Sequence, residues 1–196
     1  MPKIEAHLSY QFNMATDDVD VEESYDEPKK ANPFASLPKS TMNLDLCKKA
    51  FFTARTEGTN YFDSLFWATY DPTGFSIHLG KYKYNGDLSG MDFVRRNTVG
   101  GMVQSMDSSL AHKNLYGVFK ILKGDVGREV VAVFITRGDA INNDVFGDVA
   151  DDFEWVPLTV DDSVKKFVCD AFHTTSDSDV EQFFDGKVVE HHVMFL

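Results

Sequence analysis

Six consecutive apolar residues, Val130 to Ile135, place the strongest constraint on how this chain of 196 residues folds. A strand that borders solvent on one face alternates apolar and polar side chains, whereas this run has no polar face. We therefore predict a central strand with other layers packed on both of its faces. A second apolar run, Leu115 to Lys123, precedes it, and the Gly-containing loop 124–128 between the two runs predicts a β-hairpin.

Apolar residues recur with helical or strand periodicity on either side of this hairpin. The patterns predict helices that start near Asn43 and cover about 60–69, 92–110, 162–172 and 179–185, and strands over 75–84, 153–158 and 187–195. Helices in separate blocks around hairpin-linked strands indicate an α+β fold. We predict a mostly antiparallel sheet of about five strands surrounded by helices, as a single domain over 31–196.

Two details of this prediction depend on glycine. The first strand changes the phase of its alternation at Gly80, and a β-bulge there would bring Tyr82 and Tyr84 to the same face as Phe75. The alternative is that the two tyrosines pack on different faces. The Gly100–Gly101 pair interrupts the helix at 92–110, where each glycine costs about 1 kcal/mol relative to alanine. We expect close packing of this helix against the sheet to offset that cost.

The charge of the chain narrows its function classes. The formal net charge is −12, which disfavours non-specific binding to nucleic acid and adsorption to anionic membranes. Seven of the eleven residues over 17–27 are acidic, so we predict that 1–30 is a disordered acidic tail or linker, with a docking peptide through Ile4, Leu8 and Phe12 as the alternative. The sequence has neither a membrane-length apolar run nor a signal peptide, and its two cysteines form no Cys-x-x-Cys motif, which together favour a cytoplasmic location.

Motifs with a recognisable chemistry are absent from the sequence. It contains no glycine-rich phosphate loop, no Gly-x-Ser-x-Gly elbow and no His-Glu-x-x-His pair. Three features could bind a metal: the acidic stretches at 139–152 and 177–181 and the His191-His192 pair. A polar loop that solvates itself explains the first better, and acidic residues at a helix N-terminus explain the second. The two histidines are neighbours in a strand and therefore point to opposite faces. We therefore expect no catalytic residue, no cofactor and no metal.

Several segments at consistent spacing nevertheless carry a family resemblance. They are the opening segment 32–45 (Asn-Pro-Phe-Ala-Ser-Leu-Pro-Lys-Ser-Thr-Met-Asn-Leu-Asp), Phe66-Trp67, Phe75-Ser76-Ile77, Tyr82-Lys83-Tyr84, the stretch 97–107 with Gly101-Met102 and Gln104, 133–138 (Val-Phe-Ile-Thr-Arg-Gly), and Phe153-Glu154-Trp155 with Leu158. Residues 32–196 thus resemble the C-terminal domain of the gamma subunit of the eukaryotic translation elongation factor 1B complex.

The resemblance implies a function without catalysis. Gamma subunits carry a glutathione-transferase-like domain and a charged linker ahead of this α+β domain, so the chain would be either a fragment or a stand-alone version. Neither glutathione chemistry nor nucleotide exchange follows from the resemblance. It implies a scaffold or interaction domain that supports elongation, with the other elongation factor 1B subunits, the aminoacyl-tRNA-delivering GTPase or a tRNA synthetase as partners. Neither a membrane nor a nucleic acid is expected as a partner.

Trp, Tyr and Arg side chains dominate binding hot spots, which selects a candidate partner surface. Its residues are Trp67, Tyr82, Tyr84, Arg95 and Arg96. Packing alone is the alternative role for the two tyrosines. Two other functions stay open: an RNA-binding accessory module that uses Lys81, Lys83, Arg95 and Arg96, and an enzyme that pairs Cys47 or Cys169 with a histidine.

Overall fold

The computed structural model of the protein describes residues 31–59, 61–106, 108–124, 127–174 and 182–195. The predictions of a disordered tail over 1–30 and of an acidic motif at 177–181 lie outside the described residues. Contacts divide the chain into Met1–Ala31 and Asn32–Leu196, and all of the described helices and strands belong to the second unit.

The predicted hairpin forms the middle of the sheet. Strands β2 (Leu115–Gly124) and β3 (Gly127–Arg137) pair antiparallel along their whole length. The order of the described strands is β4-β1-β3-β2-β6-β5, and every neighbouring pair is antiparallel. The remaining strands are β1 (Phe75–Tyr82), β4 (Phe153–Pro157), β5 (Gln182–Phe183) and β6 (Lys187–Phe195). Residues 130–136 of β3 are all buried, so the predicted central strand is confirmed.

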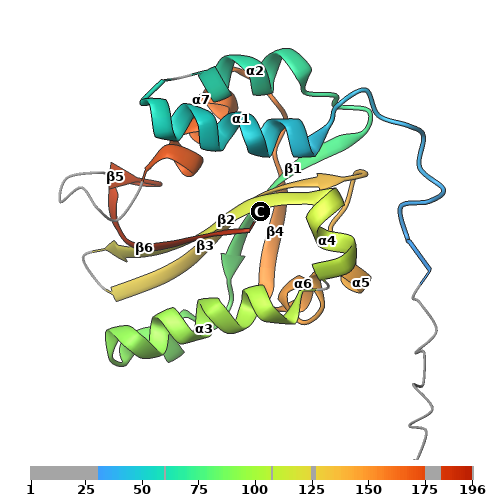
Figure 1. The fold of residues 1–196 in the computed structure, drawn as a ribbon. Coiled ribbons are helices and arrows are strands. Elements are labelled where there is room, and N and C mark those ends of the chain that lie inside the picture. Colours follow the sequence, from blue (N-terminus) through green and yellow to red (C-terminus); the bar gives the residue numbers. More distant parts are fainter. Residues whose placement is uncertain (1–30, 60, 107, 125–126, 175–181, 196) are drawn as a thin grey trace, which may run out of the picture. The chain divides into compact units, whose positions relative to one another are not determined.

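Helices cover both faces of this sheet (Figure 1). On one face, α1 (Leu44–Glu57), α2 (Tyr61–Thr69) and α7 (Asp162–His173) enclose one hydrophobic cluster. On the other face, α3 (Asp92–Ser105), α4 (Ser108–Asn114), α5 (Asn143–Phe146) and α6 (Val149–Asp152) enclose a second cluster. The fold is therefore α+β around an antiparallel sheet, as predicted. No helix in the described part of the chain is long and apolar enough to cross a membrane.

Helix ends follow from local capping. The Asn43 side chain accepts a hydrogen bond from the amide of Leu46, and α1 ends at Gly58, whose φ of 64° suits glycine. The Asp161 carboxylate accepts a bond of 2.8 Å from the amide of Val164 and so begins α7. Both helix starts agree with the sequence.

Of the two alternatives at Gly80, the β-bulge does not occur. The pairing of β1 with β3 and β4 runs through Gly80 without a register shift, so Tyr82 packs in the cluster opposite to that of Phe75. Glycine is needed at this position because the indole of Trp155 lies 2.6 Å from where a Cβ would stand.

A bulge occurs instead in β6. His191 pairs with Ile121 and Val189 with Leu122, which leaves Glu190 as the extra residue. The bulge places Val189 in the α1–α7 cluster, whereas Val193 packs in the α3 cluster. A bulge changes the direction in which a side chain points, and here the side chain concerned is that of Glu190.

Three other expectations change. The helix predicted over 92–110 is two helices, because Met106 is extended with ψ of 139°. The Gly100–Gly101 pair lies in open space, with no atom within 4 Å of an added Cβ, so close packing does not offset its cost. The part of the predicted helix 179–185 that is described contains strand β5 and a turn, because Gln182 and Phe183 pair with β6 and form a sixth strand.

Candidate interaction surface

The first turn of α3 exposes three large apolar side chains. Met91 is 67 % exposed, Phe93 is 55 % exposed and Val94 is 37 % exposed. We call these three residues the α3 patch. Tyr84, which is 51 % exposed, precedes the 3₁₀ helix η1 (Asn85–Ser89) that leads into α3. A cluster of exposed apolar residues of this kind is a mark of a binding surface on a folded domain.

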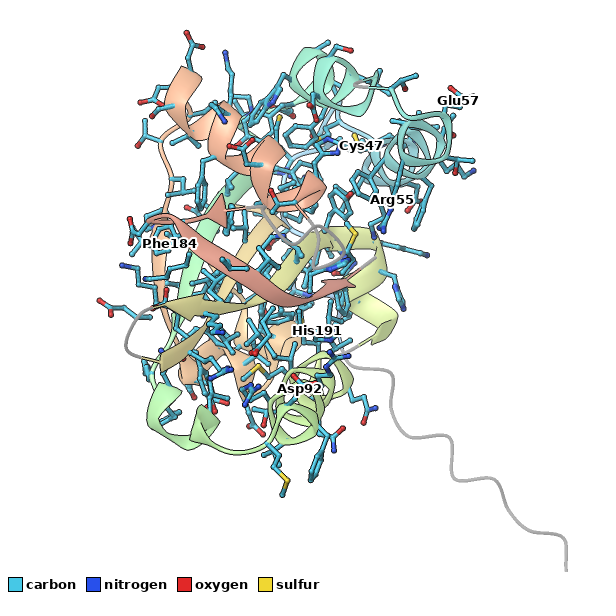
Figure 2. The ribbon with its side chains drawn as sticks, turned by 90° about the vertical axis from the view of Figure 1, so that its left-hand side faces the viewer. Cys47, Arg55, Glu57, Asp92, Phe184 and His191 are labelled. Atoms are coloured by element: carbon cyan, nitrogen blue, oxygen red, sulfur yellow. The ribbon has the colours of Figure 1, made fainter. Side chains whose placement is uncertain are left out.

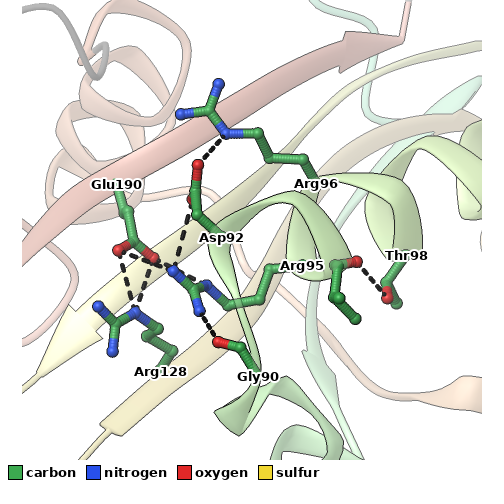
Figure 3. Close-up of polar contacts among 8 residues, drawn as sticks. Gly90, Asp92, Arg95, Arg96, Thr98, Arg128 and Glu190 are labelled. Carbon is green, nitrogen blue, oxygen red and sulfur yellow. Dashed lines mark hydrogen bonds and ion pairs between the residues drawn. The ribbon is translucent and has the colours of Figure 1, made fainter.

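A buried arginine fixes the inner face of the same helix turn (Figure 3). Arg95 is 4 % exposed. Its Nε and Nη2 atoms each lie 3.2 Å from an oxygen of Glu190 on β6, and Nη1 donates to the carbonyl of Gly90. Arg128 on β3 donates to the same carboxylate at 2.9 and 3.0 Å. Glu190 therefore joins α3 to the sheet through two arginines.

The electrostatics of this network favour an ionised carboxylate. Partial burial raises the pKa of Glu190, but the hydrogen bonds and positive charges of Arg128 and Arg95 outweigh it, so the pKa lies below its usual value. The α3 patch thus stands on a helix turn whose orientation is fixed by charge-assisted hydrogen bonds. A rigid surface loses less conformational entropy when it binds a partner.

The structure separates the five predicted surface residues. Arg96 is exposed beside the α3 patch, where its Nε lies 2.8 Å from Asp92. Arg95 points inward into the Glu190 network. Tyr82 is half-buried, with ring centroids 5.6 Å from Tyr84 and 5.3 Å from Phe153. Trp67 belongs to α2, on the opposite face of the sheet. Figure 2 shows this division, with Asp92 in the lower helix layer and Cys47 in the upper one.

Trp67 is half-buried between α2 and α7. Its Nε1 donates to Sγ of Cys169 at 3.3 Å, and its ring meets those of Phe66 and Tyr70 edge to face. Next to it, Nε2 of His173 and Oδ1 of Asp63 are 2.6 Å apart. These contacts tie α2 to α7.

The same contacts bear on the predicted thiol chemistry. Burial raises the pKa of the Cys169 thiol to about 11, against a smaller lowering by the Trp67 hydrogen bond. Burial also raises the pKa of Cys47. Since the thiolate is the nucleophile, both cysteines are held in their unreactive form although His173 lies one helical turn from Cys169.

The four cations of the RNA hypothesis do not form one open patch. Arg95 and Arg96 are ion-paired with carboxylates. The Lys83 ammonium donates to the carbonyl of Asp151 at 2.5 Å, and that of Lys81 lies 5.2 Å from the ring centroid of Phe184.

Candidate metal ligands are dispersed within the described ranges. No three His, Cys, Asp or Glu side chains there are grouped so that they could hold an ion. In the polar stretch 139–152, the side chain of Asn142 caps α5 by accepting from the amide of Asp144. The His191 and His192 ring centroids are 6.5 Å apart.

Sequence reasoning missed Met91 and Phe93. A signal was available, since Phe93 lies off the apolar stripe formed by Val99 and Met102 and so faces away from the sheet. The candidate residues were selected by the preference for Trp, Tyr and Arg at hot spots, which leaves out methionine and phenylalanine although both are also enriched at interfaces.

Comparison with known proteins identifies the family. Residues 29–140 match the family model described as elongation factor 1 gamma, conserved domain. A probable elongation factor 1-gamma 1 of Arabidopsis thaliana is 33 % identical over 147 residues, which cover 74 % of this chain and 35 % of the relative. Elongation factor 1-gamma of Drosophila melanogaster is 29 % identical over 167 residues, covering 83 % of this chain and 37 % of the relative.

The chain spans about a third of the length of the curated relatives that it matches. A third relative, elongation factor 1-gamma of Prunus avium, is 32 % identical and shows the same proportion, with 71 % of this chain and 33 % of the relative covered. The family model covers more than half of the chain. The chain therefore belongs to the elongation factor 1-gamma family.

Proposed function

We propose that residues 31–196 form a non-catalytic interaction domain, equivalent to the C-terminal domain of an elongation factor 1-gamma protein. It supports translation elongation in the cytoplasm as a scaffold of the elongation factor 1B complex, and 1–30 is the end of an acidic linker. Its partners are the other subunits of that complex, with the aminoacyl-tRNA-delivering GTPase or a tRNA synthetase as further candidates.

The observation that carries this proposal is the α3 patch on its rigid support. Met91 and Phe93 belong to neither hydrophobic cluster and expose their apolar surface to water. Covering that surface with a partner recovers about 25 cal/mol per Å² of apolar area. Tyr84 and Arg96 extend the patch, while Arg95 holds it in place. Trp67 and Tyr82 remain predicted contacts, with Trp67 on a separate surface.

The rival functions receive less support from the geometry. The raised pKa values of Cys169 and Cys47 disfavour a thiol nucleophile. The ion pairs of Arg95 and Arg96 disfavour a phosphate-binding patch.

Binding of the full chain to each purified subunit of the elongation factor 1B complex tests the proposal. We expect the double substitution Met91→Ser, Phe93→Ser to weaken binding to one subunit by at least about tenfold, because hot-spot truncations cost upward of 1–2 kcal/mol each. The matched control is Leu46→Ser, Phe52→Ser on α1, where the two side chains are 58 % and 46 % exposed.

Both double variants remove exposed apolar area, so neither should unfold the domain. Equal binding by the α3 and α1 variants would contradict the assignment of the surface. Failure of the unmodified chain to bind any subunit would contradict the scaffold function itself.

A further inference from the structure

A cavity of about 490 Å³ opens beside the start of α1, away from the α3 patch. Its walls come from the opening segment at 37–43, the first residues of α1, the start of β1 and the ends of α4 and β3. Cavities of 300–1,000 Å³ are the usual size of small-molecule sites. The function proposed above makes no use of this cavity.

The charge of the lining is opposite to that of the protein. Lys39, Lys113 and Arg137 line the cavity together with one carboxylate, Asp45, which gives a formal charge of +2. The whole chain carries −12. Among the described residues, neither the Lys39 nor the Lys113 ammonium group has a hydrogen-bond or ion-pair partner, so no structural role accounts for these two charges.

The third cation is held in place without a carboxylate. The Arg137 guanidinium donates to the carbonyls of Gly74 and Pro38 and lies 5.4 Å from the ring centroid of Phe75. Carbonyls and an aromatic ring orient the guanidinium but leave its charge uncompensated. The lining of the cavity therefore holds one fixed positive charge and two exposed lysines.

The opening segment beside Arg137 is also ordered by internal contacts. The Ser40 hydroxyl donates to Asp71 at 2.6 Å, and the amide of Met42 donates to Ser40 Oγ at 3.1 Å. These bonds fix the segment that carries Thr41, whose exposed hydroxyl completes the polar lining. The Asp71 carboxylate lies behind this segment, where it accepts hydrogen bonds from Ser40, from the amide of Thr41 at 3.4 Å and from Thr73.

We propose that this cavity binds a phosphomonoester. A phosphate monoester carries close to two negative charges at neutral pH and offers three acceptor oxygens, which matches a lining of +2 with two free ammonium groups and a hydroxyl. The phosphate belongs either to a small metabolite of mononucleotide size or to a phosphorylated side chain of another protein.

Titration of the isotope-labelled full chain with inorganic phosphate, followed by amide chemical shifts at constant ionic strength, tests the proposal. We expect saturable shifts confined to the amides of Thr41, Asp45 and Lys113, and no such shifts with chloride. The double substitution Lys39→Ala, Lys113→Ala should weaken binding at least about tenfold, since each removes a charge-assisted hydrogen bond.

The matched control is Lys123→Ala, Lys166→Ala, which removes the same charge from exposed lysines on β2 and α7, away from the cavity, and should leave the affinity unchanged. Parallel titrations with adenosine monophosphate and with a phosphoserine peptide distinguish the two sources by which of them binds more tightly. Shifts that grow linearly with phosphate, or a cavity variant that binds as well as the control variant, would overturn the proposal. Either result leaves the scaffold function untouched, because that function depends on the α3 patch.

Discussion

Replacing Glu190 with glutamine should detach α3 from the sheet more than any exposed charge substitution does. Glu190→Gln keeps the shape of the side chain but removes its charge and points an amide NH₂ at arginine donors. The Arg95 side chain is 5 % exposed and that of Glu190 is 21 % exposed, so the substitution leaves a nearly buried guanidinium without its main counter-charge.

The expected magnitude follows from this burial. Breaking a fully buried ion pair costs about 3–5 kcal/mol. Glu190 is partly solvated and Asp92 still lies 3.4 Å from Arg95, so we expect a loss of about 2 kcal/mol in the free energy of unfolding. Arg96→Gln is the control, because it removes a pair whose side chains are 51 % and 49 % exposed and should cost no more than about 0.5 kcal/mol.

Urea denaturation measures both variants, and amide hydrogen exchange shows whether the loss is local to α3. The pKa of Glu190 is lower in the folded chain than in the unfolded chain. Its contribution to the free energy of unfolding is therefore fully present above the unfolded pKa of about 4.3 and is lost as the pH falls through the pKa of the folded state. The stability difference between the unmodified chain and Glu190→Gln should therefore shrink below about pH 4. If Glu190→Gln costs no more than Arg96→Gln, the reasoning that Glu190 supports the α3 patch is refuted.

Three further predictions concern the core and its titratable groups. Gly117→Ala should lower the free energy of unfolding, measured in urea, by about 1–3 kcal/mol, since an added Cβ would lie 2.4 Å from the ring of Phe134. Gly101→Ala should instead raise the free energy of unfolding by up to about 1 kcal/mol, because the added Cβ meets nothing within 4 Å. If Gly101→Ala were the less stable of the two variants, the packing described would be contradicted. Cys169 in the native chain should react slowly with a maleimide at pH 7, because its pKa is about 11, and rapid labelling at pH 6 would revive a thiol mechanism. Burial lowers the pKa of His78, so protonation of the unfolded chain should destabilise the fold as the pH falls below about 6.5, and His78→Gln should flatten that decline in pH-dependent urea titrations.

Local patterns in the sequence predicted the frame of the fold. The apolar run ending at Ile135 determined the central strand, and Asn43 and Asp161 determined where two helices begin. In each case the residues that decide the element lie within a few positions of one another, so no tertiary information is required.

Phase changes within strands were not predictable in this way. The switch in alternation at Gly80 is compatible with a bulge or with a side chain that turns to the other face, and only the partner strands decide between them. The packing of Tyr82 against Phe153 favours the second outcome. The bulge at Glu190 gave no sequence signal, and the two arginines that its side chain contacts lie 95 and 62 positions away.

The candidate surface shows the same limit. Arg95 and Arg96 are adjacent and chemically equivalent in the sequence, but successive residues of a helix point about 100° apart. One arginine therefore reaches Glu190 inside the domain while the other stays at the surface. The sequence can indicate arginines as candidate contacts, but only the orientation of the helix decides which of them a partner can reach.

Hydrogen exchange of the full chain, alone and saturated with each purified elongation factor 1B subunit, tests the central claim most directly. We expect one subunit to slow exchange in peptides covering 84–96, where Tyr84, Met91, Phe93 and Arg96 lie, and to leave exchange in α1 unchanged. Protection confined to α1, α2 and α7, or no protection with any subunit, would contradict the assignment of the α3 patch as the surface through which this domain acts.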